Sequence, residues 1–296
     1  MGITATSLKF LLFCKKEFDV DFSITATLGR QDVAKGCGDK TMLDLIKKYV
    51  SADSCVIKDV YINAKYCEPL LNQLGAELIE SFDYSNYENA TVLHDMNMPI
   101  PEQFKNKYSL LIDGGTTEHI FNIPIAYKNI MDMVKIGGYV VSMVPANNLC
   151  GHGFYQFSPE FFYSLFQIKN GFEIKAIAYS CDDFGGMGNY ALWAIPNPLE
   201  LGRRVLINTS KDTLIYCCTK KISAVPELLT LQQSDYENVS WKKQSHETDF
   251  NDSKTVLYIK NLFPCFVKRF IRRLRCAVFA RVSKKPEKLK MKVLIK

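Results

Sequence analysis

The sequence feature that most constrains the fold is a predicted strand, helix and strand in direct succession. Residues 108–112 form a short apolar run that stops at Asp113, as a buried parallel strand stops at its carboxyl end. Apolar residues then recur at helical spacing over residues 118–135, and Gly137 ends this run before the apolar residues 139–144. Such a unit makes a right-handed crossover and leaves both strand ends on one edge of the sheet. Open α/β sheets bind ligands at that edge.

The segments before and after this unit continue the alternation of strands and helices. The last two predicted strands, residues 204–208 and 213–219, are separated by a short turn and are expected to pair as a hairpin. This alternation predicts an α/β fold: a Rossmann-like, mostly parallel sheet with helices on both faces and a terminal antiparallel hairpin. The other predicted strands are residues 22–28, 77–82, 90–94, 172–179 and 190–195, and helices are predicted at 7–16, 40–50, 67–74 and from Ser158 onward.

Composition divides the chain into three parts. Residues 1–222 carry the sheet pattern with an insertion at about 32–65, residues 223–259 are a polar linker or small lobe, and residues 260–296 form a basic amphipathic helix and tail. The tail holds thirteen Lys or Arg against one acid, so it carries a formal charge of +12 and the rest of the chain −6. Such a helix could lie on an anionic membrane, bind a partner or pack on its own domain, whereas the acidic body argues against nucleic acid.

The chain is expected in a reducing, cytoplasmic compartment. Its ten cysteines include no CxxC pair, and no signal peptide is recognisable at the start. No apolar run reaches the roughly 20 residues that a membrane span needs. Binding of lipid by the tail would place the protein peripherally at the inner face of the membrane.

Three carboxylates, Asp83, Asp95 and Asp113, follow three successive predicted strands. In a nucleotide-binding sheet, an acid after the second strand can accept both ribose hydroxyls, and one after the third can accept an adenine amine. Asp also favours turns at strand ends for local reasons. The phosphate motifs GxGxxG and GxxxxGK[ST] are absent from the sequence. Acids that could bind an adenosine, in a chain without a phosphate-binding motif, indicate S-adenosyl-L-methionine as the ligand and count against NAD and ATP.

Several motifs carry a resemblance to a known family: Thr-Leu-Gly-Arg-Gln, His-Asp-Met-Asn, Asp-Gly-Gly-Thr-Thr-Glu-His-Ile-Phe-Asn and Pro-Ala-Asn-Asn with Gly-His-Gly-Phe-Tyr-Gln-Phe-Ser-Pro. With the order of elements, they resemble class I S-adenosylmethionine-dependent methyltransferases, in an uncharacterised bacterial branch, over about residues 22–220. The resemblance implies that Asp83 binds the ribose and that Asp95 and Met96 contact the adenine, by side chain and backbone respectively.

The resemblance also concerns the two loops nearest the reactive end of the cofactor. In the turn after the first strand, only Gly29 matches the family's glycine-rich pattern. The loop that begins at Asp113 and Gly114 matches the one that lines the reactive end. We therefore expect cofactor contacts at these three residues.

Methyl transfer needs two positioned reactants and, for a hydroxyl acceptor, a base with a pKa near neutrality, which indicates histidine. His119 beside Glu118 is the first candidate, and His152 in a glycine-flanked loop is the second. A histidine near a helix start is also commonly a cap or a packed ring. No spacing typical of a metal site occurs, so no metal is expected. The residues expected to bind the acceptor are Asn147, Asn148 and Tyr155.

The sequence therefore predicts a methyltransferase that acts on an oxygen or nitrogen of a small-molecule or glycan-type acceptor. The alternative is a catalytically inactive relative that serves as a binding or scaffold protein in the biosynthesis of cell-surface polysaccharide. The atypical turn around Gly29 favours the inactive relative, and the polar residues of the two loops favour the enzyme. Methylation of nucleic acid is disfavoured because the body is acidic.

Overall fold

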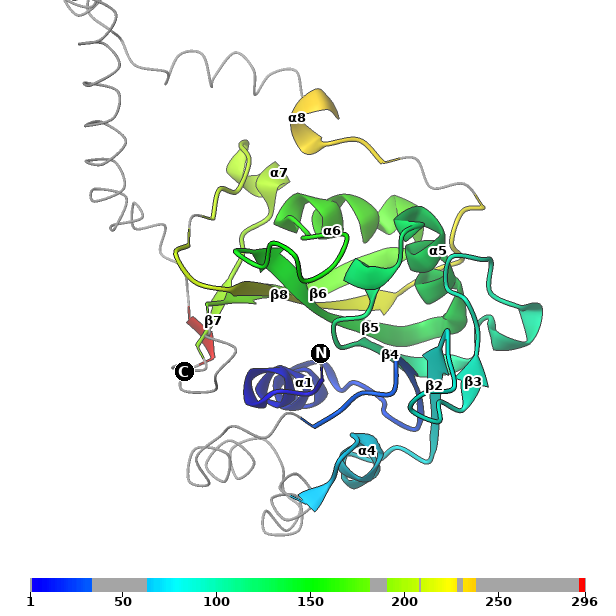
Figure 1. The fold of residues 1–296 in the computed structure, drawn as a ribbon. Coiled ribbons are helices and arrows are strands. Elements are labelled where there is room, and N and C mark those ends of the chain that lie inside the picture. The colour runs from blue at the N-terminus through cyan, green and yellow to red at the C-terminus, as the bar shows by residue number, and fades with distance from the viewer. Residues whose placement is uncertain are drawn as a thin grey trace, which may run out of the picture.

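The computed structural model describes residues 2–33, 63–181, 191–207, 209–227, 231–237 and 293–295. Among these residues one sheet is formed, in the strand order β3-β2-β1-β4-β5-β8-β6-β7-β9 (Figure 1). The strands are β1 (Ile24–Leu28), β2 (Leu78–Asp83), β3 (Val92–Leu93), β4 (Tyr108–Asp113), β5 (Val134–Asn147), β6 (Phe172–Ser180), β7 (Leu192–Ala194), β8 (Thr213–Lys221) and β9 (Val293–Ile295). The helices are α1 (Ala5–Phe18), α4 (Glu68–Gln73), α5 (Ile123–Met133), α6 (Pro159–Leu165), α7 (Pro198–Leu201) and α8 (Ser234–Glu237), with 3-10 turns η1 (Glu102–Phe104), η2 (Thr117–His119) and η3 (Ile168–Asn170).

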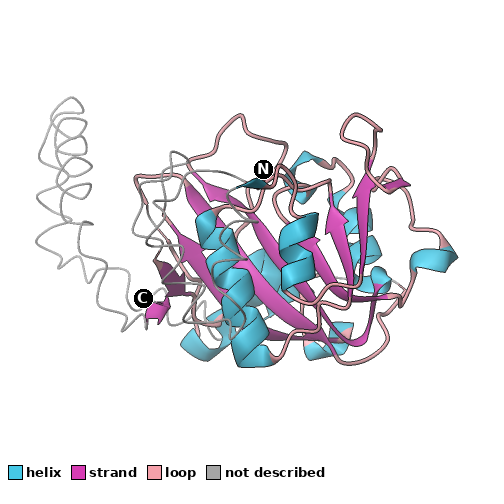
Figure 2. Cartoon of the chain, turned by 90° about the horizontal axis from the view of Figure 1, so that it is seen from below, coloured by secondary structure: helices cyan, strands magenta, loops and turns pink. Residues whose placement is uncertain are grey.

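Helices cover both faces of the sheet, as the sequence predicts (Figures 1 and 2). Helices α1 and α4 lie on one face, where their buried residues join a cluster with Leu110 and Val141 of the central strands. Helices α5 and α6 lie on the other face, in a cluster with the neighbouring Leu111 and Val140. Successive residues of a strand point to opposite faces, so a sheet covered on both sides needs continuous apolar strands. The apolar runs of β4 and β5 therefore come from burial on both faces.

The carboxyl ends of the parallel strands meet at one edge. Strand β1 pairs in parallel with β2 and with β4, so that Leu28 lies opposite both Phe82 and Asp113. Strand β3 is parallel to β2, and β5 is parallel to β4 with Asp113 opposite Ser142. The loops after β1, β2, β3, β4 and β5 therefore all leave from the same edge, which we call the functional edge, as predicted.

The antiparallel part of the sheet is present, but with a different partner strand from the one expected. Strand β8 runs between β5 and β6 and is antiparallel to both. Residues 204–207, expected to pair with it, have no strand structure, and Leu206 is 81% exposed. The apolar run at 204–208 therefore looks like a strand in sequence but has no free strand edge beside it, because β6 and β5 already occupy both sides of β8.

The expected helix at 118–135 is divided in the structure. Residues Thr117–His119 form η2, and α5 begins only at Ile123, with Pro124 in its first turn. Proline lacks the backbone N–H that a continuing helix would use and fits the first helical turn. Helix α5 then ends at Met133, and β5 starts at once with Val134 rather than after Gly137.

Lys221, at the end of β8, is a buried cation that closes the C-terminal end of α5. Its ammonium donates to the carbonyls of Met131 and Val134 at 2.9 and 2.7 Å and to Asn106 Oδ1 at 2.9 Å. The last carbonyls of a helix have no partner within the helix and carry its negative end, so a cation is favourable there. Burial nevertheless lowers the pKa of Lys221 to about 8.

Some predicted features fall on residues outside the described parts of the chain. These are most of the 32–65 insertion with its helix at 40–50, much of the 223–259 segment, and residues 260–292 of the basic tail. Residues Val293–Ile295 pair as β9 with β7. In the described parts no helix is both long and apolar enough to cross a bilayer.

Candidate functional site

The turn after β1 is closed by a glutamine side chain. Gly29 has a left-handed φ of 67° and its N–H donates to the Phe82 carbonyl at 2.7 Å. The buried Gln31 side chain donates from Nε2 to the Leu28 carbonyl and, at 3.3 Å, to Thr116 Oγ1. Gln31 Oε1 remains buried without a hydrogen-bond partner. The sequence did not single out this residue, although it occupies the motif position directly after Gly29 and Arg30.

Gly114 lets the β4 loop approach that glutamine. A Cβ atom at this position would overlap Gln31 Oε1, so any other residue would displace the end of the Gln31 side chain. The two glycines expected at the cofactor therefore both lie against the Gln31 side-chain amide, Gly114 nearest its Oε1 and Gly29 near its Nε2. This arrangement leaves a polar oxygen at the point where the first and fourth strands end.

Asp83 and Asp95 lie on adjacent strand ends, as expected. Asp83 is partly exposed, and its Oδ1 accepts from the backbone N–H of Ser85 at 3.0 Å. Asp95 Oδ1 accepts from the backbone and side chain of Asn97 at 2.9 and 2.8 Å, and the backbone hydrogen bond is the main cause of a lowered pKa. Met96 beside it is buried in the core. Each carboxylate thus keeps an oxygen that these hydrogen bonds do not use.

Asp113 is located as predicted, but its carboxylate is closed off from the edge. The residue is fully buried. Its Oδ1 accepts from the backbone N–H of Thr116 at 2.9 Å, and its Oδ2 accepts from Thr117 Oγ1 at 2.6 Å. Burial raises its pKa while these hydrogen bonds oppose the rise. The side chain therefore shapes the loop, and the predicted direct contact with a cofactor is not available to it.

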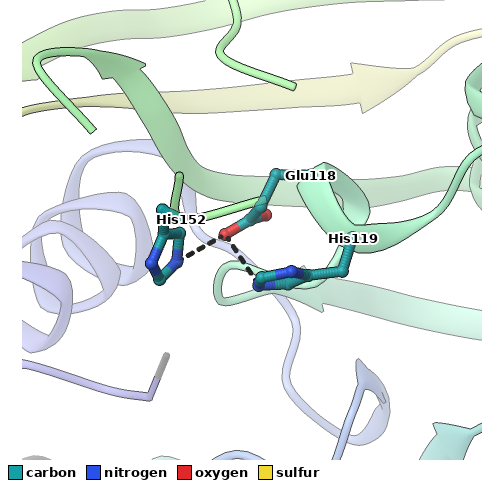
Figure 3. A group of neighbouring side chains, drawn as sticks. All are labelled: Glu118, His119 and His152. Atoms are coloured by element: carbon teal, nitrogen blue, oxygen red, sulfur yellow. Dashed lines mark ion pairs between the residues drawn. The ribbon is translucent and has the colours of Figure 1, made fainter. Parts of the chain in front are cut away.

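The three residues named as catalytic candidates come together at the functional edge (Figure 3). Glu118 Oε1 lies 3.5 Å from His152 Nε2 and 3.8 Å from His119 Nε2, and the two imidazole centroids are 5.1 Å apart. Glu118 and His119 belong to η2, whereas His152 comes from the loop after β5. We call these three residues the Glu-His-His cluster. The histidine after β3, His94, lies outside it and has Nε2 at 3.2 Å from the Met98 carbonyl.

The Glu118 backbone holds the two loops together. Its carbonyl accepts from the N–H groups of Phe154 and Tyr155 at 2.8 and 3.2 Å. A Cβ atom at Gly153 would lie 2.8 Å from the same carbonyl, so only glycine allows this approach. The glycines flanking His152 are therefore explained in part by loop contact.

Burial sets the electrostatics of the cluster. The Glu118 side chain is fully enclosed, and burial, followed by the negative charge of Asp113, raises its pKa to about 8. Burial lowers the pKa of His119 and of His152, and His119 is lowered further by His152. Both imidazoles are therefore held towards the neutral form, which can accept a proton or bind a metal.

The residues expected to bind the acceptor are engaged elsewhere. Asn148 Nδ2 donates to the carbonyls of Thr209 and Lys211 at 3.0 and 2.6 Å, and Asn147 Nδ2 lies 3.3 Å from Thr209 Oγ1. The two amides thus join the end of β5 to the segment before β8. Tyr155 donates its hydroxyl to the Phe121 carbonyl at 2.6 Å. The turn-forming interpretation of the asparagines fits these contacts.

Two exposed aromatic rings flank the cluster and were not singled out from the sequence. Phe121 and Phe154 are 71% and 66% exposed, and their rings meet edge to face with centroids 5.8 Å apart. Each follows a cluster histidine by two residues, at His119 and His152 respectively. Exposed aromatic side chains in such a pair offer an apolar surface for the flat face of a ligand.

Comparisons with known proteins give likenesses to solved structures only. No family model matches the chain, and no curated protein matches its sequence. The N-methyltransferase NodS from Bradyrhizobium japonicum, solved with S-adenosyl-L-homocysteine, shares 8% identity and a TM-score of 0.39 over 74% of this chain and 88% of that chain.

Two further solved structures are similar to the same degree. TehB from Haemophilus influenzae shares 14% identity with a TM-score of 0.37 over 72% of this chain and 61% of that chain. The branched-chain polyamine synthase from Thermus thermophilus shares 9% identity with a TM-score of 0.36, over 76% of this chain and only 57% of the synthase. At such values the likeness carries no conclusion about activity. The fold class rests on the strand order, in which β3-β2-β1-β4-β5 is the order of a Rossmann-like parallel sheet and β8, β6 and β7 form its antiparallel end.

Proposed function

We propose that this protein is an S-adenosylmethionine-dependent methyltransferase that acts on an oxygen or nitrogen of a small-molecule or glycan-type acceptor. The observation that carries the proposal is the arrangement of the functional edge. Carboxylates follow β2 and β3 without a phosphate cradle, and two imidazoles with a buried carboxylate follow β4 and β5 on the same edge. The carboxylates after β2 and β3 suit the binding of an adenosine, and the imidazoles after β4 and β5 suit proton transfer.

The residues present fit the adenosine end of the cofactor and offer one buried acceptor near its other end. Asp83 has a partly exposed carboxylate for the ribose hydroxyls, and the Asp95-Met96 turn is placed for the adenine. At the other end, Gln31 Oε1 is a buried acceptor without a partner, and an ammonium donor would reach it only after the Gly114 loop that lies against it moves. It would take the place of the glycine-rich turn that this chain lacks. The cofactor, when bound, supplies an electrophilic methyl group on a sulfonium.

The Glu-His-His cluster is proposed to prepare the acceptor. A neutral imidazole of His119 or His152 would accept the acceptor proton at Nε2 and so leave a lone pair on the acceptor oxygen or nitrogen for the methyl group that the cofactor would supply. Glu118, close to both rings, stabilises the imidazolium that results. The exposed rings of Phe121 and Phe154 give a surface for a sugar or an aromatic acceptor.

Calorimetric titration with S-adenosylmethionine and S-adenosylhomocysteine tests the cofactor step. We expect micromolar binding that Asp83→Ala weakens at least tenfold. Asp21→Ala is the matched control, because Asp21 accepts from the backbone N–H of Ser23 at 2.9 Å in the same kind of turn but precedes β1, at the opposite edge of the sheet. Equal losses in both variants would mean that the carboxylate of Asp83 has no special role.

The inactive scaffold is the second candidate, and the Gln31 side chain that fills the β1 turn favours it. Absence of measurable heat with either cofactor form would leave this candidate ahead. Peripheral binding to an anionic membrane remains a separate proposal that rests on the basic composition of residues 260–296. Co-sedimentation with anionic liposomes, unchanged after deletion of residues 260–292, would remove it.

A further inference from the structure

We propose that Glu118, His119 and His152 bind one divalent transition-metal ion of the Zn²⁺ type, with further coordination positions open to an acceptor. This inference concerns the same cluster but does not depend on the proposed methyl transfer, because metal binding can be measured without cofactor or acceptor. The ligand atoms of the three side chains all lie within 4.8 Å of one another. It replaces the expectation of a protein without a metal.

The first argument is the state of the Glu118 carboxylate. The side chain is fully buried, and neither of its oxygens has a hydrogen-bond partner. A buried carboxylate is costly unless it is paired or coordinates a metal. In the described parts of the chain no Lys or Arg lies within ion-pair distance of it, and the side chains that do are the two imidazoles. A cation would supply the missing compensation.

The second argument is the spacing of the three side chains. The Glu118 Oε1 to His Nε2 distances of 3.5 and 3.8 Å are too long for good hydrogen bonds. Two ligands of one tetrahedral ion, at metal–ligand distances of about 2.1 Å, are about 3.4 Å apart. The observed separations are close to that value, and both imidazoles are partly exposed, so rotation of the rings can bring all three atoms onto one ion.

The third argument is that the backbone holds the cluster in place. The Glu118 carbonyl accepts from Phe154 and Tyr155, so η2 and the β5 loop are joined directly beneath the side chains. His119 N–H donates to the Thr116 carbonyl at 3.0 Å, and His152 N–H donates to the Leu149 carbonyl at 3.1 Å. His152, which is 34 residues from Glu118 and 33 from His119 in sequence, is thereby brought beside them on fixed turns, as a metal site requires.

The ligand set selects the kind of metal. Two imidazoles and one carboxylate suit Zn²⁺ and neighbouring first-row metals, whereas Mg²⁺ and Ca²⁺ prefer oxygen ligands. Three protein ligands leave a position for a water or substrate oxygen, as in catalytic zinc sites. An acceptor hydroxyl bound there would lose its proton more easily, because the ion stabilises the anion. The cluster would then activate an acceptor through the cation, in place of direct proton transfer to an imidazole Nε2.

Metal titration of the full chain tests this site. The protein is first dialysed against a chelator, and Zn²⁺ or Mg²⁺ is added alone in a calorimeter. We expect one Zn²⁺ per chain at this site, bound at least a hundredfold more tightly than Mg²⁺, with affinity reduced at least tenfold in Glu118→Gln and in His119→Gln. His119 is partly exposed, so its replacement tests the ligand role even if Glu118→Gln disturbs folding. Thermal melting without metal reports on the folding of each variant.

Two control variants separate this site from other metal ligands. His94→Gln removes a histidine at the same edge that lies outside the cluster, and Cys150→Ser removes an exposed thiol two residues from His152. Zn²⁺ affinity should be unchanged in both. Absence of Zn²⁺ binding by the wild type, unchanged binding in Glu118→Gln and His119→Gln, or a loss that follows Cys150 instead would each overturn the proposal. Cofactor titration is independent of all these outcomes.

Discussion

Two buried carboxylates five residues apart, Asp113 and Glu118, are treated in opposite ways by the fold. Both are fully enclosed. Asp113 accepts hydrogen bonds from Thr116 and Thr117 in the loop that follows it, whereas neither oxygen of Glu118 accepts one. A satisfied buried acid stabilises the structure that donates to it, and an unsatisfied one is a cost that the rest of the fold must cover. We infer that Asp113 builds the loop and Glu118 is kept for function.

Matched amide replacements should separate the two roles. Asp113→Asn removes the charge that accepts from the loop N–H group of Thr116 and requires the Thr117 hydroxyl to turn from donor to acceptor, so we expect it to lower the free energy of unfolding by about 2–4 kcal/mol. Glu118→Gln replaces a carboxyl group that accepts no hydrogen bond, and burial raises its pKa to about 8, so little charge is lost at neutral pH. The metal-free protein should therefore change by less than about 0.5 kcal/mol or become more stable. Urea unfolding at neutral pH measures both.

The reverse ranking would contradict this division of roles. If Glu118→Gln destabilised the protein as much as Asp113→Asn, the Glu118 carboxylate would have a stabilising partner within the folded chain. Activity adds a second measurement, because Glu118→Gln should abolish function in a protein that remains fully folded. Asp113→Asn should lose activity only in proportion to its unfolding.

Lys221 extends the comparison to a buried cation. Like the Asp113 carboxylate, the Lys221 ammonium has hydrogen-bond partners: two carbonyls at the end of α5 and the Asn106 side chain. Lys221→Met keeps the length of the aliphatic chain but leaves these acceptors without a donor. We expect a loss of about 1–3 kcal/mol in the free energy of unfolding at neutral pH, less than for Asp113→Asn because the lost ammonium was itself costly to bury.

The pH dependence of this loss has a defined sign. The pKa of Lys221 is lowered to about 8 in the folded protein, below the ordinary lysine value of 10.5. Between these values the unfolded chain binds more protons than the folded one, so stability of the wild type rises with pH. The stability difference between wild type and Lys221→Met should therefore grow between about pH 8 and 10.5. A difference that shrinks over this interval would mean that burial does not lower the pKa.

Sequence patterns predicted the functional edge well because the ends of strands can be recognised from the sequence alone. The alternation of apolar runs with Asp83, Asp95 and Asp113 was enough to predict one edge, and the motif positions of Glu118 and His152 were enough to expect them on that edge. Hydrophobic periodicity reports burial, and strand ends are where it stops.

Most of the predictions that the structure contradicts concern contacts between segments far apart in the sequence. Nothing local reveals that Asn148 is used by Thr209 and Lys211, 61 and 63 residues away. Asp113 is a different case, because its partners lie only 3 and 4 residues on and the strand pattern does not show that its side chain turns inward to them. The run at 204–208 has strand composition, yet both sides of β8 are already taken by β5 and β6. Hydrogen-bond partners of this kind follow from the assembled sheet and cannot be read from the pattern alone.

Tyr155 gives the smallest expected effect, and it extends the comparison of buried polar groups to a hydrogen bond that is partly exposed to water. Its hydroxyl donates to the Phe121 carbonyl at 2.6 Å in a partly exposed position beside the Glu-His-His cluster. Water can replace that donor, so Tyr155→Phe should cost only about 0.5 kcal/mol in the free energy of unfolding. Tyr163→Phe is the matched variant, since the Tyr163 hydroxyl donates to the Ile195 carbonyl at 2.7 Å in a more buried position, and we expect about 1 kcal/mol there. Urea unfolding measures both variants. A larger loss of stability in Tyr155→Phe than in Tyr163→Phe would show that the exposed loop depends on this hydrogen bond for its structure. Burial would then not determine how much stability is lost when a carbonyl at this edge loses its donor.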